Sequence, residues 1–133
     1  MRFATFNINN INKRLANLLA WLAKAQPDVV SLQELKVEQG AFPVTALRNV
    51  GYEAVWQGER SWNGVAILSR VGLDDVVPGL PGGPGFPHQE ARMVSATAVG
   101  IRVHSVYTPN GRVPGSEHYH YKLAWLTALR DVL

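Results

Sequence analysis

The order of hydrophobic and polar residues predicts strands and helices that alternate along the chain. Residues 2–8 alternate apolar with polar side chains and run into a stretch of asparagines, which is typical of a strand that ends in a polar loop. From Ile11 onward the apolar residues recur at the spacing of one helix face. Residues 28–33 are predicted as the second strand, and its apolar residues Val29, Val30 and Leu32 indicate a strand covered on both faces. This strand, helix and strand predict a right-handed crossover.

Turn and cap residues set the expected ends of the elements. Asn9 or Asn10 is the expected N-cap of the first helix, and Pro27 ends that helix. Gly51 ends a second, short helix, and a hairpin turns at Gly100. The ranges predicted beyond the second strand are a helix over 43–50, strands over 52–57, 64–69, 90–99 and 101–107, a Pro/Gly loop without helix or strand over 78–87, and a helix from Ser116 onward.

Length and composition predict one globular domain without disorder, since the 133 residues are 47% hydrophobic and 17% charged. The net charge of +3 favours a polyanionic partner. The absence of cysteine excludes disulfides, thiolate catalysis and cysteine-ligated metal centres, and it fits a reducing compartment. No apolar segment is long enough for a signal peptide or a membrane span, so we expect a cytoplasmic protein without a membrane partner.

Polar side chains gather where three of the predicted strands end. They form the pairs Asn7 and Asn9, Gln33 and Glu34, and Tyr107 and Asn110. Because loops converge over the carboxyl ends of strands in layered α/β folds, these pairs are candidates for one site. Taken singly, the asparagines are explained at least as well by their preference for turns, and Glu34 by a solvated strand end.

A single carboxylate flanked by amides is the kind of site that Mg²⁺ occupies, because this ion keeps most of its waters and binds one or two carboxylates together with substrate phosphate. Such an ion polarises a phosphoryl oxygen and neutralises the charge that develops during in-line attack by water. These residues therefore predict hydrolysis of a phosphodiester or a phosphomonoester. They do not by themselves supply a general base.

Five short motifs follow one another along the whole chain. They are Phe6-Asn7-Ile8-Asn9, Leu32-Gln33-Glu34-Leu35-Lys36, the run from Trp62 to Ser69, Glu90-Ala91-Arg92 and Tyr107-Thr108-Pro109-Asn110-Gly111. Together they resemble the exodeoxyribonuclease III and AP endonuclease branch of the endonuclease/exonuclease/phosphatase superfamily. The resemblance implies a DNase I-like α/β fold, a four-layered sandwich of mixed sheets flanked by helices, of which residues 1–133 would be the amino-terminal half. It also implies a Mg²⁺- or Mn²⁺-dependent enzyme of base-excision repair that cuts DNA at abasic sites and trims 3′ ends.

The resemblance assigns roles to particular residues. Glu34 would hold the metal with Asn7 beside it, and the phenol of Tyr107 would contact the scissile phosphate or organise the nucleophile. The residues that it assigns to contacts with DNA are Asn9, Lys36, Trp62, Arg92, Asn110 and Arg112. For Trp62 an exposed loop side chain that packs on its neighbours is nearly as good an explanation, and for Lys36 a solvated lysine is the commoner fate.

Two features of the sequence depart from the pattern of this branch. Asn10 stands where the branch has glycine, and we expect the turn to survive because asparagine tolerates a left-handed backbone. The Gly-Asp-x-Asn and Ser-Asp-His motifs of the branch do not occur in the chain. We therefore expect a fragment that is inactive or nearly so alone. Its strands would build one sheet with an uncovered apolar face, through which the chain self-associates.

Two other functions remain open at this point. The chain could be a non-catalytic nucleic-acid-binding module that keeps the basic residues and lacks the chemistry. It could also be a relative from the same superfamily that acts on a phosphomonoester or a lipid headgroup, because the Asn and Glu motifs are shared across the superfamily.

Overall fold

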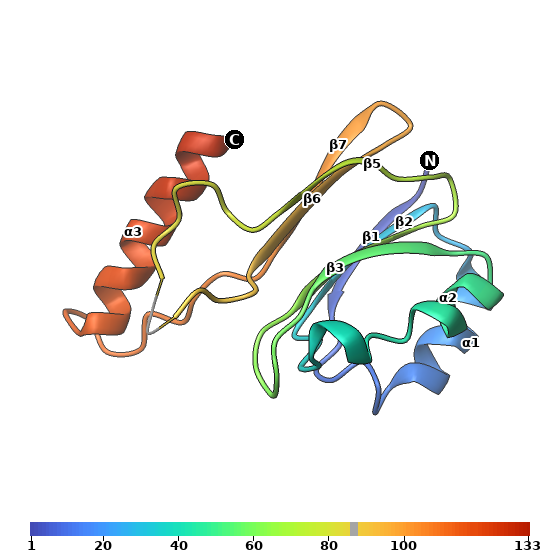
Figure 1. Ribbon diagram of the computed structural model, residues 1–133, viewed down its shortest axis with the longest axis horizontal. Helices are drawn as coiled ribbons and strands as arrows, with labels where there is room; N and C mark the ends of the chain where they lie inside the picture. Colours follow the sequence, from blue (N-terminus) through green and yellow to red (C-terminus); the bar gives the residue numbers. More distant parts are fainter. Residues whose placement is uncertain (86–87) are drawn as a thin grey trace.

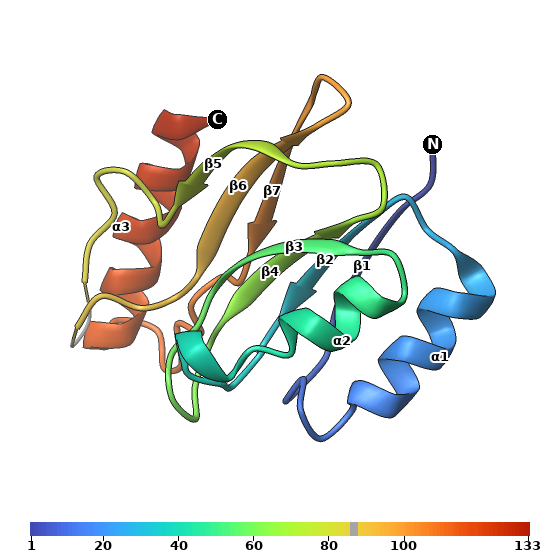
Figure 2. The same cartoon turned by 45° about the vertical axis from the view of Figure 1, so that its right-hand side comes forward.

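The computed structural model describes residues 1–85 and 88–133, and its elements lie in four layers (Figure 1). The strands are β1 (Phe3–Asn7), β2 (Val29–Gln33), β3 (Glu53–Gln57), β4 (Val65–Ser69), β5 (Asp74–Pro78), β6 (Met93–Ala98) and β7 (Ile101–Val106). The helices are α1 (Leu15–Ala25), α2 (Val44–Asn49) and α3 (Glu117–Val132), with a short 3-10 helix, η1 (Gln39–Ala41). Helices α1 and α2 lie outside one sheet, and α3 lies outside the other (Figures 1 and 2).

The two sheets have different strand patterns. The first has the order β1-β2-β4-β3 and is mixed, because β1 and β2 run parallel while β4 is antiparallel to both of its neighbours. The second has the order β5-β6-β7 and is antiparallel throughout. The predicted α/β sandwich is therefore confirmed. The expectation of one sheet is wrong, because the strands after β4 pair with one another and form a second layer.

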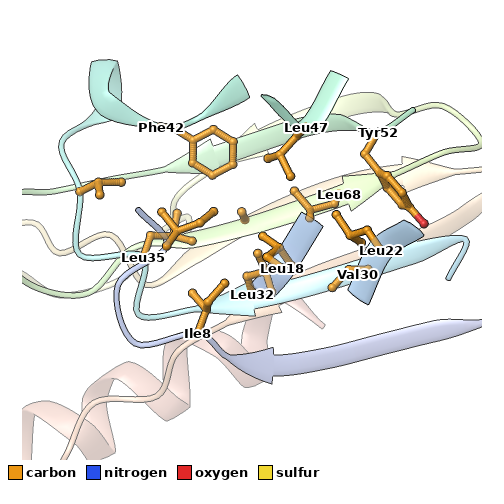
Figure 3. Packing of buried hydrophobic residues seen from close by; sticks show 13 residues of the cluster. Ile8, Leu18, Leu22, Val30, Leu32, Leu35, Phe42, Leu47, Tyr52 and Leu68 are labelled. Carbon is orange, nitrogen blue, oxygen red and sulfur yellow. The ribbon is translucent and has the colours of Figure 1, made fainter. Parts of the chain in front are cut away.

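The larger core lies between the first sheet and its two helices. Leu18 and Leu22 of α1 and Leu47 of α2 pack against β-strand side chains such as Leu32, which is fully buried (Figure 3). A smaller core fills the space between the two sheets, and its members are Val29, Val65, Ile67, Val94, Ala96 and Ala98. The strand β2 contributes Val30 and Leu32 to the larger core and Val29 to the smaller one, which explains why it has apolar residues on both faces.

We expect Leu32→Ala to lower the free energy of unfolding by about 2–5 kcal/mol, because it removes a fully buried side chain and leaves a cavity. The measurement is chemical denaturation followed by circular dichroism. Leu123→Ala on α3 is the matched control, since Leu123 is 45% exposed and the change there should stay within about 0.5 kcal/mol. Equal losses in both variants would contradict this assignment of the core.

The structure corrects some predicted boundaries. The N-cap of α1 is Arg14, so the prediction of Asn9 or Asn10 is wrong. Both asparagines adopt positive φ, and Asn10 Oδ1 accepts a hydrogen bond from the Lys13 amide, so they form a turn ahead of the helix. The prediction of Ser116 as the start of α3 is confirmed, because its hydroxyl accepts a hydrogen bond from the Tyr119 amide.

The strand β5 and the Pro/Gly loop show where the pattern was uninformative. The sequence predicted no strand over 74–78, and all five residues of β5 are exposed, so they carry no alternation of buried and exposed positions. The predicted loop over 78–87 begins one residue later, since Pro78 ends β5, and residues 79–85 form neither helix nor strand. Positions 86 and 87 of that prediction lie outside the described residues.

The outer edges of β1 and β7 carry no further strand within the described residues. A hollow of about 560 Å³ lies beside β1 on the side of α1, lined by residues that include Phe6 and Trp21. A second hollow, of about 340 Å³, is lined by residues of β1, β2 and β7, among them Phe3 and Ser31. The hydroxyl of Ser31 is the one buried side-chain oxygen or nitrogen in the described part that lacks a hydrogen-bond partner. The β1 edge is therefore open on both of its faces.

No helix in the described ranges is long and apolar enough to cross a membrane.

Candidate active site

The candidate site forms where β1 and β2 end beside each other. The two strands are parallel and pair Asn7 with Gln33, so the residues that follow them leave the sheet at the same edge. The backbone amide of Asn10 then donates to the carbonyl of Glu34 at 2.9 Å, which keeps the two loops together beyond the strands. Glu34 has a φ of 55°, a left-handed backbone that turns its side chain away from the strand direction.

The turn after β2 packs so closely against the residue that precedes β4 that only glycine fits there. Gly64 has a φ of +94°, and a Cβ at this position would lie 2.8 Å from the Cβ of Leu35. The Leu35 amide donates to the carbonyl of Gly64 at 3.1 Å, so the backbone after β2 rests directly on this residue. Any larger side chain at Gly64 would push the segment that carries Glu34 out of position.

The carboxylate of Glu34 is contacted from three directions. The phenol of Tyr107 donates to Oε1 at 2.7 Å, and the ammonium of Lys36 lies 3.2 Å from Oε2. The side-chain amide of Asn7 also donates a hydrogen bond to this carboxylate. Lys36 donates in addition to Oδ1 of Asn9 at 2.7 Å. The structure thus brings together five of the residues singled out from the sequence, which lie at or just past the ends of β1, β2 and β7.

Hydrogen bonds and burial shift two pKa values in opposite directions. The hydrogen bond from Tyr107, followed by those from Asn7 and Lys36, lowers the pKa of Glu34 below 4.5 against the opposing effect of burial. Burial and the hydrogen bond to Glu34 raise the pKa of Tyr107 to about 12. At neutral pH Glu34 is therefore ionised and Tyr107 is a neutral phenol, which makes Tyr107 a hydrogen-bond donor in this arrangement.

The donor atoms at this site suit a hard cation. Glu34 offers a carboxylate, while the side-chain oxygen of Asn7 accepts from the Asn9 amide at 3.1 Å and that of Asn9 accepts from Lys36. In the described ranges no group of three or more His, Cys, Asp or Glu side chains could hold a metal ion. A single carboxylate with amides and water is sufficient for Mg²⁺, which takes its remaining ligands from solvent and phosphate. The Lys36 ammonium lies against the same carboxylate, so a bound cation would share or displace that contact.

A second group of predicted residues lines a cavity of about 440 Å³ next to Tyr107. Its lining includes Trp62, Arg92, Tyr107, Asn110 and Arg112. The indole of Trp62 is 69% exposed, while the Asn110 side chain accepts a hydrogen bond from the Arg112 amide at 2.8 Å. Tyr107 joins the two groups, because it lines this cavity and also donates to Glu34.

Arg92 differs from the other residues assigned to DNA, because it is only 9% exposed. Its Nε and Nη2 atoms donate to the two carboxylate oxygens of Glu90 at 3.0 and 3.1 Å. Its Nη1 donates to the main-chain oxygen of Tyr107 at 3.3 Å. The guanidinium is thus engaged within the protein, and a contact to DNA stays a prediction for this residue.

Sequence reasoning missed the buried polar network around Glu90. Asn63 donates to Oε1 of Glu59 at 2.5 Å and to Oε2 of Glu90 at 3.2 Å, and Tyr121 of α3 donates to Glu90 as well. Burial by itself raises the pKa of Glu90, but the hydrogen bonds and charge of Arg92 and the bond from Tyr121 bring it below the ordinary value. Asn63 and Glu90 stand inside the recognised motifs, which was a usable signal, whereas nothing local distinguished Glu59.

Comparison with curated proteins shows that the chain is similar to exodeoxyribonucleases. The chain is 43% identical to exodeoxyribonuclease III of Haemophilus influenzae over 70 residues, which are 53% of this chain and 26% of that protein. It is 28% identical to an exodeoxyribonuclease of Bacillus subtilis over 133 residues, covering 97% of this chain and 50% of that protein. The chain therefore spans half or less of the length of these relatives.

Two solved structures of related enzymes also match nearly all of this chain and half of their own length. A 3′ phosphatase from Neisseria, NExo, bound to a product DNA hairpin, matches with a TM-score of 0.92 and 42% identity over 98% of this chain and 50% of that one. An AP endonuclease from Archaeoglobus fulgidus matches with a TM-score of 0.90 and 40% identity over the same shares. These matches confirm the DNase I-like fold and the resemblance to the exodeoxyribonuclease III and AP endonuclease branch. The sequence model of the endonuclease/exonuclease/phosphatase family also matches residues 4–133, so the chain belongs to that family.

Proposed function

We propose that residues 1–133 are the amino-terminal half of an endonuclease/exonuclease/phosphatase domain that hydrolyses phosphodiesters in DNA with the help of Mg²⁺ or Mn²⁺. The substrates would be abasic sites and 3′ ends of duplex DNA in base-excision repair. The observation that carries this proposal is the convergence of Asn7, Glu34 and Tyr107 beside a cavity that also bears Asn110 and Arg112. The absence of cysteine supports a reducing compartment, and we propose the cytoplasm.

Some residues of this half would bind the metal ion, and others would bind the DNA substrate. Glu34 and Asn7 would hold the cation, which when bound supplies Lewis-acid stabilisation of charge on the phosphate. The phenol of Tyr107 keeps the carboxylate oriented and remains protonated at neutral pH because of its raised pKa. Asn110, Arg112 and the exposed Trp62 line the adjacent cavity, where they would contact the phosphates and sugars of the strand.

The remaining half of such a domain would supply what these residues lack. Within the described ranges Glu34 belongs to no group of three or more His, Cys, Asp or Glu side chains that could hold a metal ion. The relatives above are about twice as long as the aligned part or longer. We therefore propose that the isolated chain is inactive or nearly so, because catalytic groups that act as a unit lose far more than their share of rate when one part is missing.

The test of this function is complementation. The chain is mixed with the half of the Bacillus subtilis exodeoxyribonuclease that it does not match, and the cleavage of a duplex with one abasic site is followed in Mg²⁺ or in chelator. We expect cleavage only in the mixture with Mg²⁺, and none when the chain carries Glu34→Ala. Cleavage by the chain alone that depends on Glu34 would contradict the proposed inactivity. No cleavage by the mixture, despite a formed complex, would contradict the nuclease function.

A second candidate is hydrolysis of a phosphomonoester, and one of the solved structures favours testing it. The Neisseria relative at 42% identity carries the name 3′ phosphatase and was solved with a DNA hairpin. A duplex with a 3′-phosphate therefore belongs in the same assay, with an inositol phosphate as the comparison for a small monoester. Release of phosphate from the DNA end alone would place the activity on DNA 3′ ends. Turnover of the inositol phosphate alone would favour a phosphatase of small molecules.

A third candidate is a binding module without chemistry, which the lone carboxylate and the net charge of +3 allow. Such a module would bind duplex DNA with an affinity that falls as salt rises, and neutralising Arg112 would reduce the salt dependence. It would show no cleavage in the complementation assay. Cleavage and binding thus separate this candidate from the first.

We propose that the chain self-associates through the open edge of β1. This edge has hollows on both faces, and Phe3, the first residue of β1, is 49% exposed. Light scattering coupled to size-exclusion chromatography should show a mass that rises with concentration. Phe3→Lys should lower that mass, because a charged side chain blocks edge pairing, whereas Val113→Lys at a 69% exposed loop position should not. A monomer at high concentration would contradict the proposal.

A further inference from the structure

The buried ion pair of Glu90 and Arg92 lies directly behind Tyr107. We propose that this pair holds the phenol of Tyr107 against Glu34, so that Arg92 is a positioning residue for the active site. The inference rests on the proposed function, since the reaction is what gives the position of Tyr107 its importance.

Tyr107 lies just past the end of β7, so its position depends on the residues that contact it there. Arg92 contacts it in three ways. The Tyr107 amide donates to the carbonyl of Arg92 at 2.8 Å, and Nη1 of Arg92 donates to the carbonyl of Tyr107 at 3.3 Å. The guanidinium carbon also lies 5.1 Å from the centre of the Tyr107 ring, within the range of a cation–π contact.

Glu90 in turn fixes the plane of the guanidinium. A guanidinium that donates to both oxygens of one carboxylate is held in a single orientation, which a lysine ammonium does not achieve. With Nε and Nη2 on Glu90 and Nη1 on Tyr107, each nitrogen of the guanidinium already donates inside the protein. These bonds use three of the five N–H groups of the guanidinium.

Because the pair is buried, we infer that its main effect is to orient Tyr107 and that it adds little to the stability of the fold. The side chains of Arg92 and Glu90 are 11% and 13% exposed. A buried ion pair gains little net stability over well-packed apolar side chains, because removing both charges from water costs about as much as their attraction returns. What the pair provides and an apolar pair would not is a fixed direction for the group that it contacts, here Tyr107.

The same carboxylate connects Tyr107 with the loop between β3 and β4. Asn63 in that loop donates to Glu90 at 3.2 Å, and the Ala91 amide donates to Glu59 of the loop at 3.0 Å. The loop exposes Trp62 at the mouth of the cavity. A strand of DNA that presses on this loop would therefore act on the support of Tyr107.

The test measures the position of the phenol without metal or DNA. In the 133-residue chain, the exchange rate of the Tyr107 hydroxyl proton with water is measured by NMR, and Tyr107→Phe assigns the signal. The main variant is Arg92→Met combined with Glu90→Gln, which removes both charges together and avoids leaving one of them buried and unpaired. Arg102→Met on β7 is the matched control, because Arg102 donates to the carbonyl of Asp75 and does not line the cavity.

We expect the double variant to speed hydroxyl exchange by about ten-fold, the change that corresponds to losing the net contribution of one hydrogen bond. The control should leave the rate unchanged. An unchanged rate in the double variant, or an equal rise in the control, would overturn the inference. If the double variant fails to fold, Arg92→Lys decides the question, because it keeps the charges and loses only the planar fork. Faster exchange in Arg92→Lys supports the inference and an unchanged rate overturns it.

Failure of this inference is distinguishable from failure of the proposed function. Hydroxyl exchange is measured in the absence of substrate, so it reports on the support of Tyr107 whether or not the complemented protein cleaves DNA. Absence of cleavage with normal dependence of exchange on Arg92 would overturn the nuclease proposal alone. Cleavage with exchange that does not depend on Arg92 would overturn the positioning role alone.

Discussion

Glu34→Gln is expected to weaken the binding of a divalent cation by at least about 100-fold, because even a group that only orients a metal ligand contributes about 10–100-fold and Glu34 is the proposed ligand itself. The substitution keeps the size of the side chain and its ability to accept from Tyr107, but it removes the only carboxylate among the residues gathered at the site. Binding is measured by titrating Mn²⁺ into the chain and following the relaxation of water protons.

Glu38→Gln is the matched control for this titration. Glu38 follows the same segment, and its side chain is 60% exposed in an ion pair with Arg60. An exposed pair of this kind contributes little to stability, and the change should leave Mn²⁺ binding as it was. Equal weakening by both substitutions would indicate nonspecific attraction of the cation to acidic surface groups, and it would remove the support for a metal on Glu34.

Tyr107→Phe is expected to lower both Mn²⁺ affinity and the rate of complemented DNA cleavage by about 10–100-fold, as is usual when a residue that orients a metal ligand is lost. The change removes one hydroxyl, which donates to Glu34 at 2.7 Å, and leaves the ring that contacts Arg92. Because the pKa of Tyr107 is raised to about 12, the ratio of wild-type to variant rate should be constant between about pH 6 and 9, where the phenol stays protonated.

Tyr119→Phe is the matched control for Tyr107→Phe. Tyr119→Phe alters a tyrosine on α3 whose ring contacts His120 instead of the site, so it should change neither Mn²⁺ affinity nor cleavage. A ratio of rates for Tyr107→Phe that grows steeply with pH across that range would show that the phenolate takes part. Tyr107 would then act as a base and not as a donor.

Much of the fold followed from the sequence because its determinants are local. The alternation over residues 2–8, the helical spacing after Ile11 and the hydroxyl of Ser116 each act on neighbours in the chain, and the corresponding elements are present. β5 escaped prediction because a strand with every residue exposed has no pattern of its own, and it exists through its pairing with β6. The N-cap of α1 was misplaced because Asn9 and Asn10 turn to meet the segment after β2.

Part of the candidate site was also predictable, because strand ends can be located from local sequence. Asn7 and Glu34 could be placed together from sequence, since parallel strands bring their carboxyl ends to one edge of a sheet. The resemblance assigned Tyr107 to the scissile phosphate or the nucleophile, whereas its contact with Glu34, across 73 positions of the chain, was not predicted. The engagement of Arg92 by Glu90 could not be inferred, because a motif records which residues occur and not which atoms they contact.

The sequence by itself determined the order of the strands and helices other than β5, the apolar residues of β2 and the supply of oxygen donors at strand ends. These properties depend on backbone preference and on the period of apolar side chains, which act over a few residues. Only the tertiary structure decided which polar groups meet. The packing of β7 against β2, where Ser105 donates to the carbonyl of Leu32, carries Tyr107 to Glu34 and encloses Arg92 with Glu90. Burial then fixes the partners, because a charge removed from water must find its counterpart among the groups that the sheets bring within reach.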